Sequence, residues 1–130
     1  MVLGIEPRPG EIISGTDSFL LLLESVESDS LGAIVDSSHM FISRETPSIS
    51  IGKLGKKISG VHVSDTDGLT DVHWPPGQGQ IDWSDILIAL ELVNYGGTLS
   101  IDVTGIDVKE ELIEGKLFLT NLIRKLGMIA

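Results

Sequence analysis

Residues 32–39, GAIVDSSH, decide the fold, because an apolar run ends there in an acid and, three residues later, in a histidine. The small and β-branched side chains from Leu31 to Val35 are typical of a strand that is buried on both faces. In parallel sheets, functional groups gather at the carboxyl ends of the strands. The stretch therefore predicts a buried parallel strand that delivers Asp36 and His39 to a site.

Three further strands are predicted around this one, and helices alternate with all four. The predicted strands cover 2–5, 31–35, 58–63 and 98–103. The predicted helices cover about 16–28, a weaker segment through 49–58, 82–94 and about 108–126. Residues 41–47 are expected to form an irregular loop, and 68–79 a functional loop because of its length. This order predicts one α/β domain over 1–130 with a parallel sheet.

The composition narrows the function classes. The 130 residues include 42% hydrophobic residues, which excludes a disordered chain, and no cysteine, so any metal must be held by Asp, Glu and His. The formal net charge of −10 disfavours nucleic acid as a partner, since affinity for it comes largely from Lys and Arg. No run approaches the roughly 20 apolar residues of a membrane span, and no secretory leader is visible, so a cytoplasmic protein is expected.

Polar side chains occupy the carboxyl ends of all four predicted strands: Glu6, Asp36, His62 and Asp102. Those ends share one rim of a parallel sheet, where three carboxylates and an imidazole would suit Mn²⁺, Mg²⁺, Co²⁺ or Zn²⁺. The alternative for each is a helix cap, a loop residue or a structural histidine. A calcium loop at 65–68 lacks the remaining ligand spacing.

Three linked segments resemble the xylose isomerase-like TIM barrel superfamily, which includes sugar-phosphate isomerases and epimerases, inosose dehydratases and family 2 apurinic endonucleases. They are AIVDSSH at 33–39, GVHVSD at 60–65 and HWPPGQGQIDW at 73–83. LGIEP at 3–7 is similar to the fifth strand of that barrel. The resemblance implies half a TIM (β/α)8 barrel, comprising strands five to eight.

The resemblance also implies roles for the rim residues. Glu6, Asp36 and His62 would bind a divalent metal, with Asp102 replacing the family's usual glutamate as fourth ligand. Glu6 and Asp102 would be the catalytic acid and base, and His39 and His73 would contact substrate. Asp102 is one methylene shorter than Glu, roughly 1.5 Å of reach, and a misplacement of about 1 Å can cost on the order of 100-fold in rate.

Three functions follow as hypotheses. The first is a metal-dependent isomerase or epimerase acting on a small sugar or polyol by proton transfer next to a carbonyl. The second is a non-catalytic half-barrel subunit or remnant, and DNA repair of the apurinic endonuclease kind is third because of the acidic charge. A half barrel leaves two strand edges unpaired. We therefore expect a homodimer or a separate amino-terminal-half chain to complete it.

Overall fold

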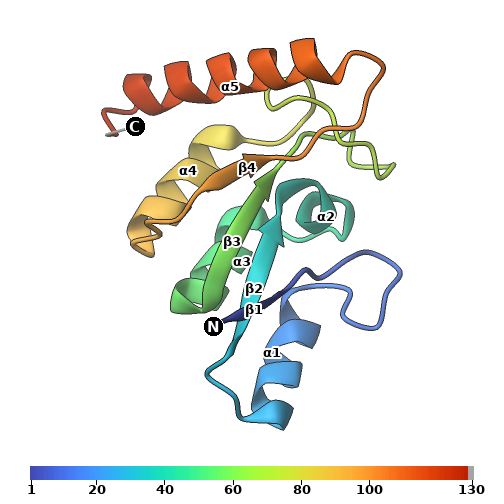
Figure 1. The fold of residues 1–130 in the computed structure, drawn as a ribbon, viewed down its shortest axis with the longest axis vertical. Coiled ribbons are helices and arrows are strands. Elements are labelled where there is room, and N and C mark those ends of the chain that lie inside the picture. The colour runs from blue at the N-terminus through green and yellow to red at the C-terminus, as the bar shows by residue number, and fades with distance from the viewer. Residues whose placement is uncertain (129–130) are drawn as a thin grey trace.

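The structure, a computed structural model, describes residues 1–128 and contains four strands that alternate with helices (Figure 1). In chain order the elements are β1 (Leu3–Ile5), α1 (Thr16–Val26), β2 (Leu31–Asp36), α2 (Ser37–Ile42), α3 (Pro47–Leu54), the 3-10 turn η1 (Gly55–Lys57), β3 (Ile58–Val63), α4 (Trp83–Leu92), β4 (Leu99–Ile101) and α5 (Val108–Lys125). The sheet order is β1-β2-β3-β4, and all three pairings are parallel. The predicted α/β fold with four parallel strands is confirmed.

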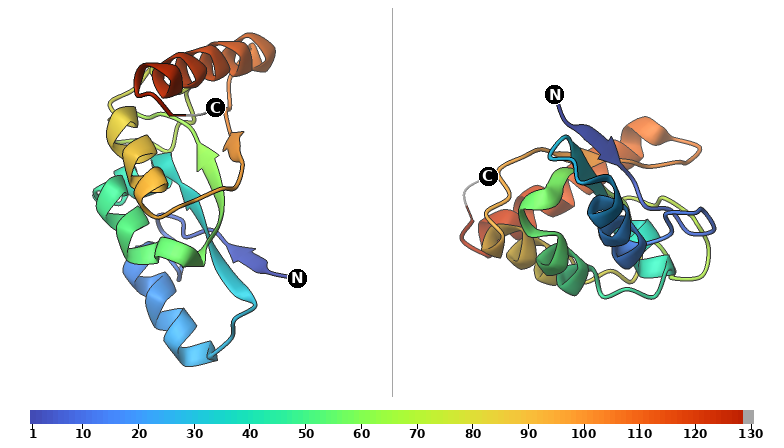
Figure 2. Two further views of the ribbon diagram at one scale, coloured as in Figure 1. Left: turned by 90° about the vertical axis from the view of Figure 1, so that its left-hand side faces the viewer. Right: turned by 90° about the horizontal axis from the view of Figure 1, so that it is seen from below.

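The helices cover one face of the sheet and leave the other bare (Figure 2). Alternate residues of the two central strands point toward the helices, so Ala33, Val35, Val61 and Val63 are all buried. They pack in one cluster with apolar residues of the helices, including Phe19, Ile51, Ile86 and Leu90. The opposite residues of the same strands face away from the helices, and the bare face consists of them.

The loop predicted over residues 41–47 is shorter in the structure, and both of its predicted bounds are wrong. The helix α2 extends to Ile42, and Pro47 begins α3. Asp36 starts α2 because its side chain accepts a hydrogen bond from the backbone N–H of His39 at 2.9 Å. Proline suits the first turn of α3, where its missing N–H would have no intrahelical partner.

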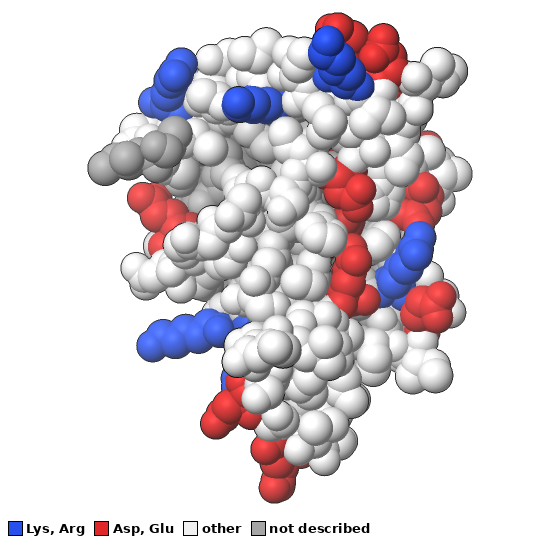
Figure 3. Space-filling view, in the orientation of Figure 1, with Lys and Arg blue, Asp and Glu red and all other residues white. Residues whose placement is uncertain are grey.

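Figure 3 looks onto the bare face, on which charged side chains are sparse near the centre and acidic ones gather to its right. Within residues 1–128, no helix is both long enough and apolar enough to cross a membrane.

Candidate functional site

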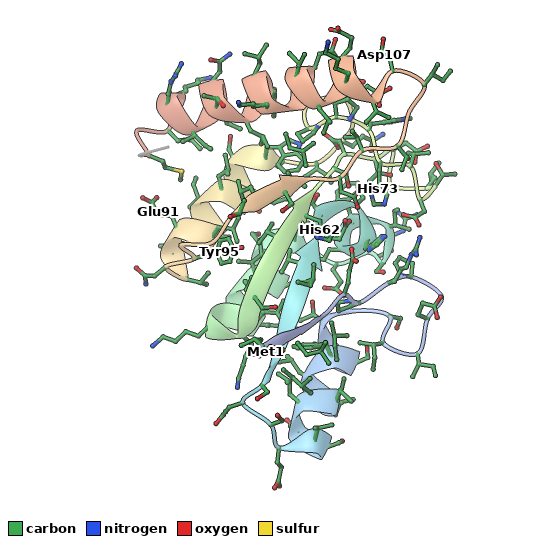
Figure 4. All side chains as sticks on the ribbon, viewed as in Figure 1. Met1, His62, His73, Glu91, Tyr95 and Asp107 are labelled. Atoms are coloured by element: carbon green, nitrogen blue, oxygen red, sulfur yellow. The ribbon has the colours of Figure 1, made fainter. Side chains whose placement is uncertain are left out.

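Three of the four predicted strand-end residues meet on the bare face of the sheet. Glu6 follows β1, and Asp36 and His62 are paired in register on β2 and β3. Each of the three offers a ligand atom, and these atoms all lie within 4.8 Å of one another. The Nδ1 of His62, labelled on β3 in Figure 4, is 3.3 Å from the Oε1 of Glu6. Neighbouring parallel strands thus bring two carboxylates and an imidazole to one point.

Asp36 is the buried member of this group, with 1% of its surface exposed. Its Oδ1 caps α2, whereas its Oδ2 is buried and has no hydrogen-bond partner within the described part of the chain. Burial raises the pKa of the Asp36 carboxyl, and the lowering effect of His39 only partly opposes it. A buried carboxylate oxygen without a donor, beside a second carboxylate and an imidazole, fits a hard or borderline divalent cation.

The fourth strand-end residue, Asp102, lies apart from this group. Its backbone N–H bonds to the carbonyl of Val63, but its carboxylate Oδ2 is 3.4 Å from the Nδ1 of His73. Among residues 1–128, Asp102 belongs to neither cluster whose ligand atoms lie within 4.8 Å of one another. Asp102 lies two residues beyond Ser100, the register partner of His62, so it stands further along the sheet than His62 does.

A second cluster adjoins the first and contains Asp36, His39 and His73, all buried. The two imidazole rings meet edge to face with centroids 5.3 Å apart. The Nδ1 of His39 is 3.4 Å from Glu6 Oε1, and its Nε2 is 3.4 Å from Asp71 Oδ1. Neither nitrogen has a partner in hydrogen-bond geometry within the described residues. The two histidines expected to contact substrate therefore lie together beside the carboxylates.

Sequence reasoning gave no role to Asp71 or Arg8, although both belong to this region. The Oδ1 of Asp71 is 3.2 Å from the Nε2 of His73, and its Oδ2 accepts a hydrogen bond from Arg8 at 3.3 Å. Burial alone would raise the pKa of Asp71, but His39, Arg8 and His73 together outweigh it and lower that pKa. The Asp-x-His spacing of Asp71 and His73 is the sequence signal that could have identified the acid.

The loop that carries Asp71 and His73 is built around the buried carboxylate of Asp65. One of its oxygens accepts the backbone N–H of Thr66 and Ile81, at 2.9 and 3.2 Å. The other accepts the backbone N–H of Gly77 at 2.9 Å and the indole N–H of Trp83 at 2.8 Å. Four donors thus converge on one side chain, so the acid that suggested a calcium loop organises backbone instead.

Comparison with known proteins places this fold in a wider context. A family model described as xylose isomerase-like TIM barrel matches residues 1–122. Fructoselysine 3-epimerase of Escherichia coli O157:H7 is 24% identical over 106 residues, which are 82% of this chain and 38% of that protein. An uncharacterized protein of Methanocaldococcus jannaschii is 31% identical over 104 residues, 78% of this chain and 32% of that protein.

Solved structures show the same fold. A D-tagatose 3-epimerase-like protein superposes with a TM-score of 0.86 at 25% identity, covering 98% of this chain and 48% of that one. An L-ribulose 3-epimerase superposes with a TM-score of 0.79 at 19% identity, covering 98% and 50%. The chain spans about half the length of these solved proteins and 38% or less of the two curated relatives.

Proposed function

The chain belongs to the xylose isomerase-like TIM barrel family, and we propose that it is the metal-binding half of a sugar or polyol isomerase or epimerase. The observation that carries this proposal is the group formed by Glu6, Asp36 and His62, in which Asp36 has a buried oxygen that no donor among residues 1–128 reaches. The names of the relatives support a sugar as substrate, since they are epimerases of fructoselysine and ribulose. Because the chain spans 38% of the first and 50% of the second, activity, substrate and partner all belong to the proposal.

The three residues of the group would hold one divalent ion, of which Mn²⁺, Mg²⁺, Co²⁺ and Zn²⁺ all suit mixed carboxylate and imidazole ligands. When bound, such an ion polarises the carbonyl and hydroxyl oxygens of a sugar. Asp36 contributes a ligand that is already fixed, because α2 holds its other oxygen in place. The site would therefore be ordered before substrate arrives.

Proton transfer is assigned to Glu6 and Asp102, which follow the two outer strands of the sheet. Asp36 and His62 lie between them, so a substrate over the centre would have one acid on either side. Removal of a proton from the carbon next to a carbonyl on one side and its return on the other would invert that carbon. His39 and His73 would orient the hydroxyl groups of the substrate, and the carboxylate of Asp71 and the backbone carbonyl of Asp102 hold the ring of His73.

Isotope exchange tests this assignment. The chain, supplied with a divalent ion and a completing half barrel, is expected to exchange a carbon-bound proton of a ketose with D₂O, followed by NMR. Glu6→Gln keeps the size of the side chain but removes the base, so exchange should fall by about 100-fold or more. Asp82→Asn, at the cap of α4, serves as the control that keeps exchange. Unchanged exchange in Glu6→Gln would refute the role given to Glu6.

A non-catalytic half-barrel subunit is the second candidate. It is favoured by the coverage of about half of the solved relatives and by Asp102, whose side chain is shorter than the glutamate that the family resemblance led us to expect. The metal content of the purified chain distinguishes the two candidate functions. A subunit that has lost catalytic activity need not bind a stoichiometric divalent ion. Either function requires a second half for the barrel, which is a second copy or a separate amino-terminal half.

A further inference from the structure

Strands β2 and β3 separate directly after two of the residues that would bind the metal. The last register pair between these strands is Asp36 with His62. At the next residue, Ser37, the chain leaves β2 and begins α2 (Figure 1), whereas β3 ends at Val63. The backbone ladder between the two strands therefore stops at the two ligands, where the spacing between the chains matters most.

The side chain of Ser37 joins the two chains beyond the end of this ladder. Its hydroxyl donates to the carbonyl oxygen of Ser64 at 2.6 Å and accepts the backbone N–H of the same residue at 3.0 Å. Both serines are buried, so water does not compete for these hydrogen bonds. One hydroxyl thus binds both backbone groups of the residue that lies two positions beyond His62.

Ser38, the next residue of α2, contacts the same serine in a different way. The hydroxyl of Ser64 donates to the hydroxyl of Ser38 at 2.8 Å, and Ser38 is also buried. This hydrogen bond joins two side chains and does not involve the backbone of Ser64. Ser37 and Ser38 therefore share their burial, their helical turn and their partner residue, but it is Ser37 that holds the backbone after β3.

This link connects the positions of the two ligands. Asp36 is fixed on the side of α2, because its Oδ1 accepts the backbone N–H of His39. His62 extends from β3, whose end is tied to α2 through Ser64 and Ser37. Groups that bind a metal must be held to within about 0.5 Å of their productive positions. The two hydrogen bonds of Ser37 supply such a constraint between the ends of β2 and β3.

We propose that Ser37 is a positioning residue that holds Asp36 and His62 at the spacing that a divalent ion requires. The inference rests on the proposed function, since it concerns the ligands of that site. Ser37 would contact neither the ion nor the substrate, and it would act through the backbone of Ser64. The alternative is that Ser37 only satisfies two buried backbone groups, so that its loss would lower stability without changing metal binding.

Titration of the metal-free chain with Co²⁺, followed by calorimetry and visible absorption, tests the proposal. In Ser37→Ala the affinity should fall by about 10-fold or more, and the d–d bands of bound Co²⁺ should shift because the ligand geometry relaxes. Ser38→Ala is the matched control, which also loses a buried hydrogen bond of Ser64. It should keep the wild-type spectrum and an affinity within about 3-fold of wild type.

Hydrogen exchange on the metal-free chain tests the link itself. In Ser37→Ala the backbone N–H of Ser64 loses its acceptor and should exchange at least about 10-fold faster than in wild type, as measured by NMR. In Ser38→Ala the exchange rate of this amide should stay close to that of wild type. Far-UV circular dichroism and urea denaturation of both variants confirm that they are folded and compare their losses of stability.

Two outcomes would overturn this inference alone. One is Co²⁺ binding by wild type with the same affinity and spectrum in Ser37→Ala as in Ser38→Ala. The other is an exchange rate of the Ser64 amide that Ser37→Ala leaves unchanged. Absence of Co²⁺ binding by the wild-type chain would instead refute the proposed function, and this inference with it.

Discussion

Asp36 performs two tasks with one carboxylate. One oxygen caps α2, and the other lies buried beside Glu6 and His62, with no donor in the described part of the chain. A charged group in such a position costs stability unless a cation compensates it. The position of Asp36 at the end of a strand was predictable from the sequence, because the apolar run ends there. The contacts of Asp71 with His39 and Arg8 were not, since they join a loop to helix α2 and to a second loop, and no local pattern encodes the paths of those loops.

Asp36→Asn should make the metal-free chain more stable at pH 7, by about 1 kcal/mol, because asparagine keeps the cap and removes the buried charge. The raised pKa of Asp36 means that the folded state holds the proton more tightly than the unfolded state. Wild-type stability should therefore rise as the pH falls through that pKa, and Asp36→Asn should lack this rise. Urea denaturation at several pH values measures both effects. A variant clearly less stable than wild type at pH 7 would contradict this account.

Asp65 presents the opposite case, a buried carboxylate with four donors. Asp65→Asn places an NH₂ group against donors that need an acceptor, so we expect a loss of about 2 to 4 kcal/mol in the free energy of unfolding. Thermal denaturation followed by tryptophan fluorescence, to which the buried Trp83 contributes, reports this loss. The matched change Asp82→Asn keeps a helix cap and should alter stability by less than about 0.5 kcal/mol. Equal effects of the two changes would argue against the special role of Asp65.

The strands and helices of the structure follow the sequence patterns that predicted them closely. Where an observed element differs from the predicted one, the cause is local. The six residues of α2 have little helical periodicity, and the helix exists because Asp36 caps it at the end of β2. The segment 73–83 was recognised as a motif, but the reason for Gly79 becomes visible only when the segment folds over Asp65. A Cβ at Gly79 would lie 2.2 Å from Asp65 Oδ1 and 2.4 Å from the carbonyl oxygen of Thr66.

Gly79→Ala should therefore destabilise the chain by about 1 to 3 kcal/mol, since backbone at that distance must move. Gly52→Ala is the matched control, because a Cβ at that position within α3 meets nothing within 4 Å. Alanine should stabilise α3 there by about 0.5 to 1 kcal/mol. Denaturant titration of both variants measures the change in the free energy of unfolding, which should be a decrease for Gly79→Ala and an increase for Gly52→Ala. A neutral Gly79→Ala would show that the loop does not pack against Asp65 as described.

Residues 1–128 form a four-stranded βα unit, and the chain covers about half of the D-tagatose 3-epimerase-like protein and of the L-ribulose 3-epimerase. This architecture followed from the alternation of strands and helices in the sequence. The separation of Asp102 from the other strand-end residues did not follow from the sequence. The sequence suggested one set of four residues at the strand ends, whereas Asp102 lies with His73 and apart from the other three. Such a separation depends on the twist and register of β4, which the sequence pattern does not specify.

The most direct test is a calorimetric titration of the metal-free chain with Mn²⁺ or Co²⁺. The account predicts one ion per chain, bound by Glu6, Asp36 and His62. Affinity should fall by about 100-fold in Asp36→Asn and stay within a few-fold of wild type in Asp102→Asn, because Asp102 lies outside the group. Absence of stoichiometric binding, or binding that Asp36→Asn leaves unchanged, would contradict the account.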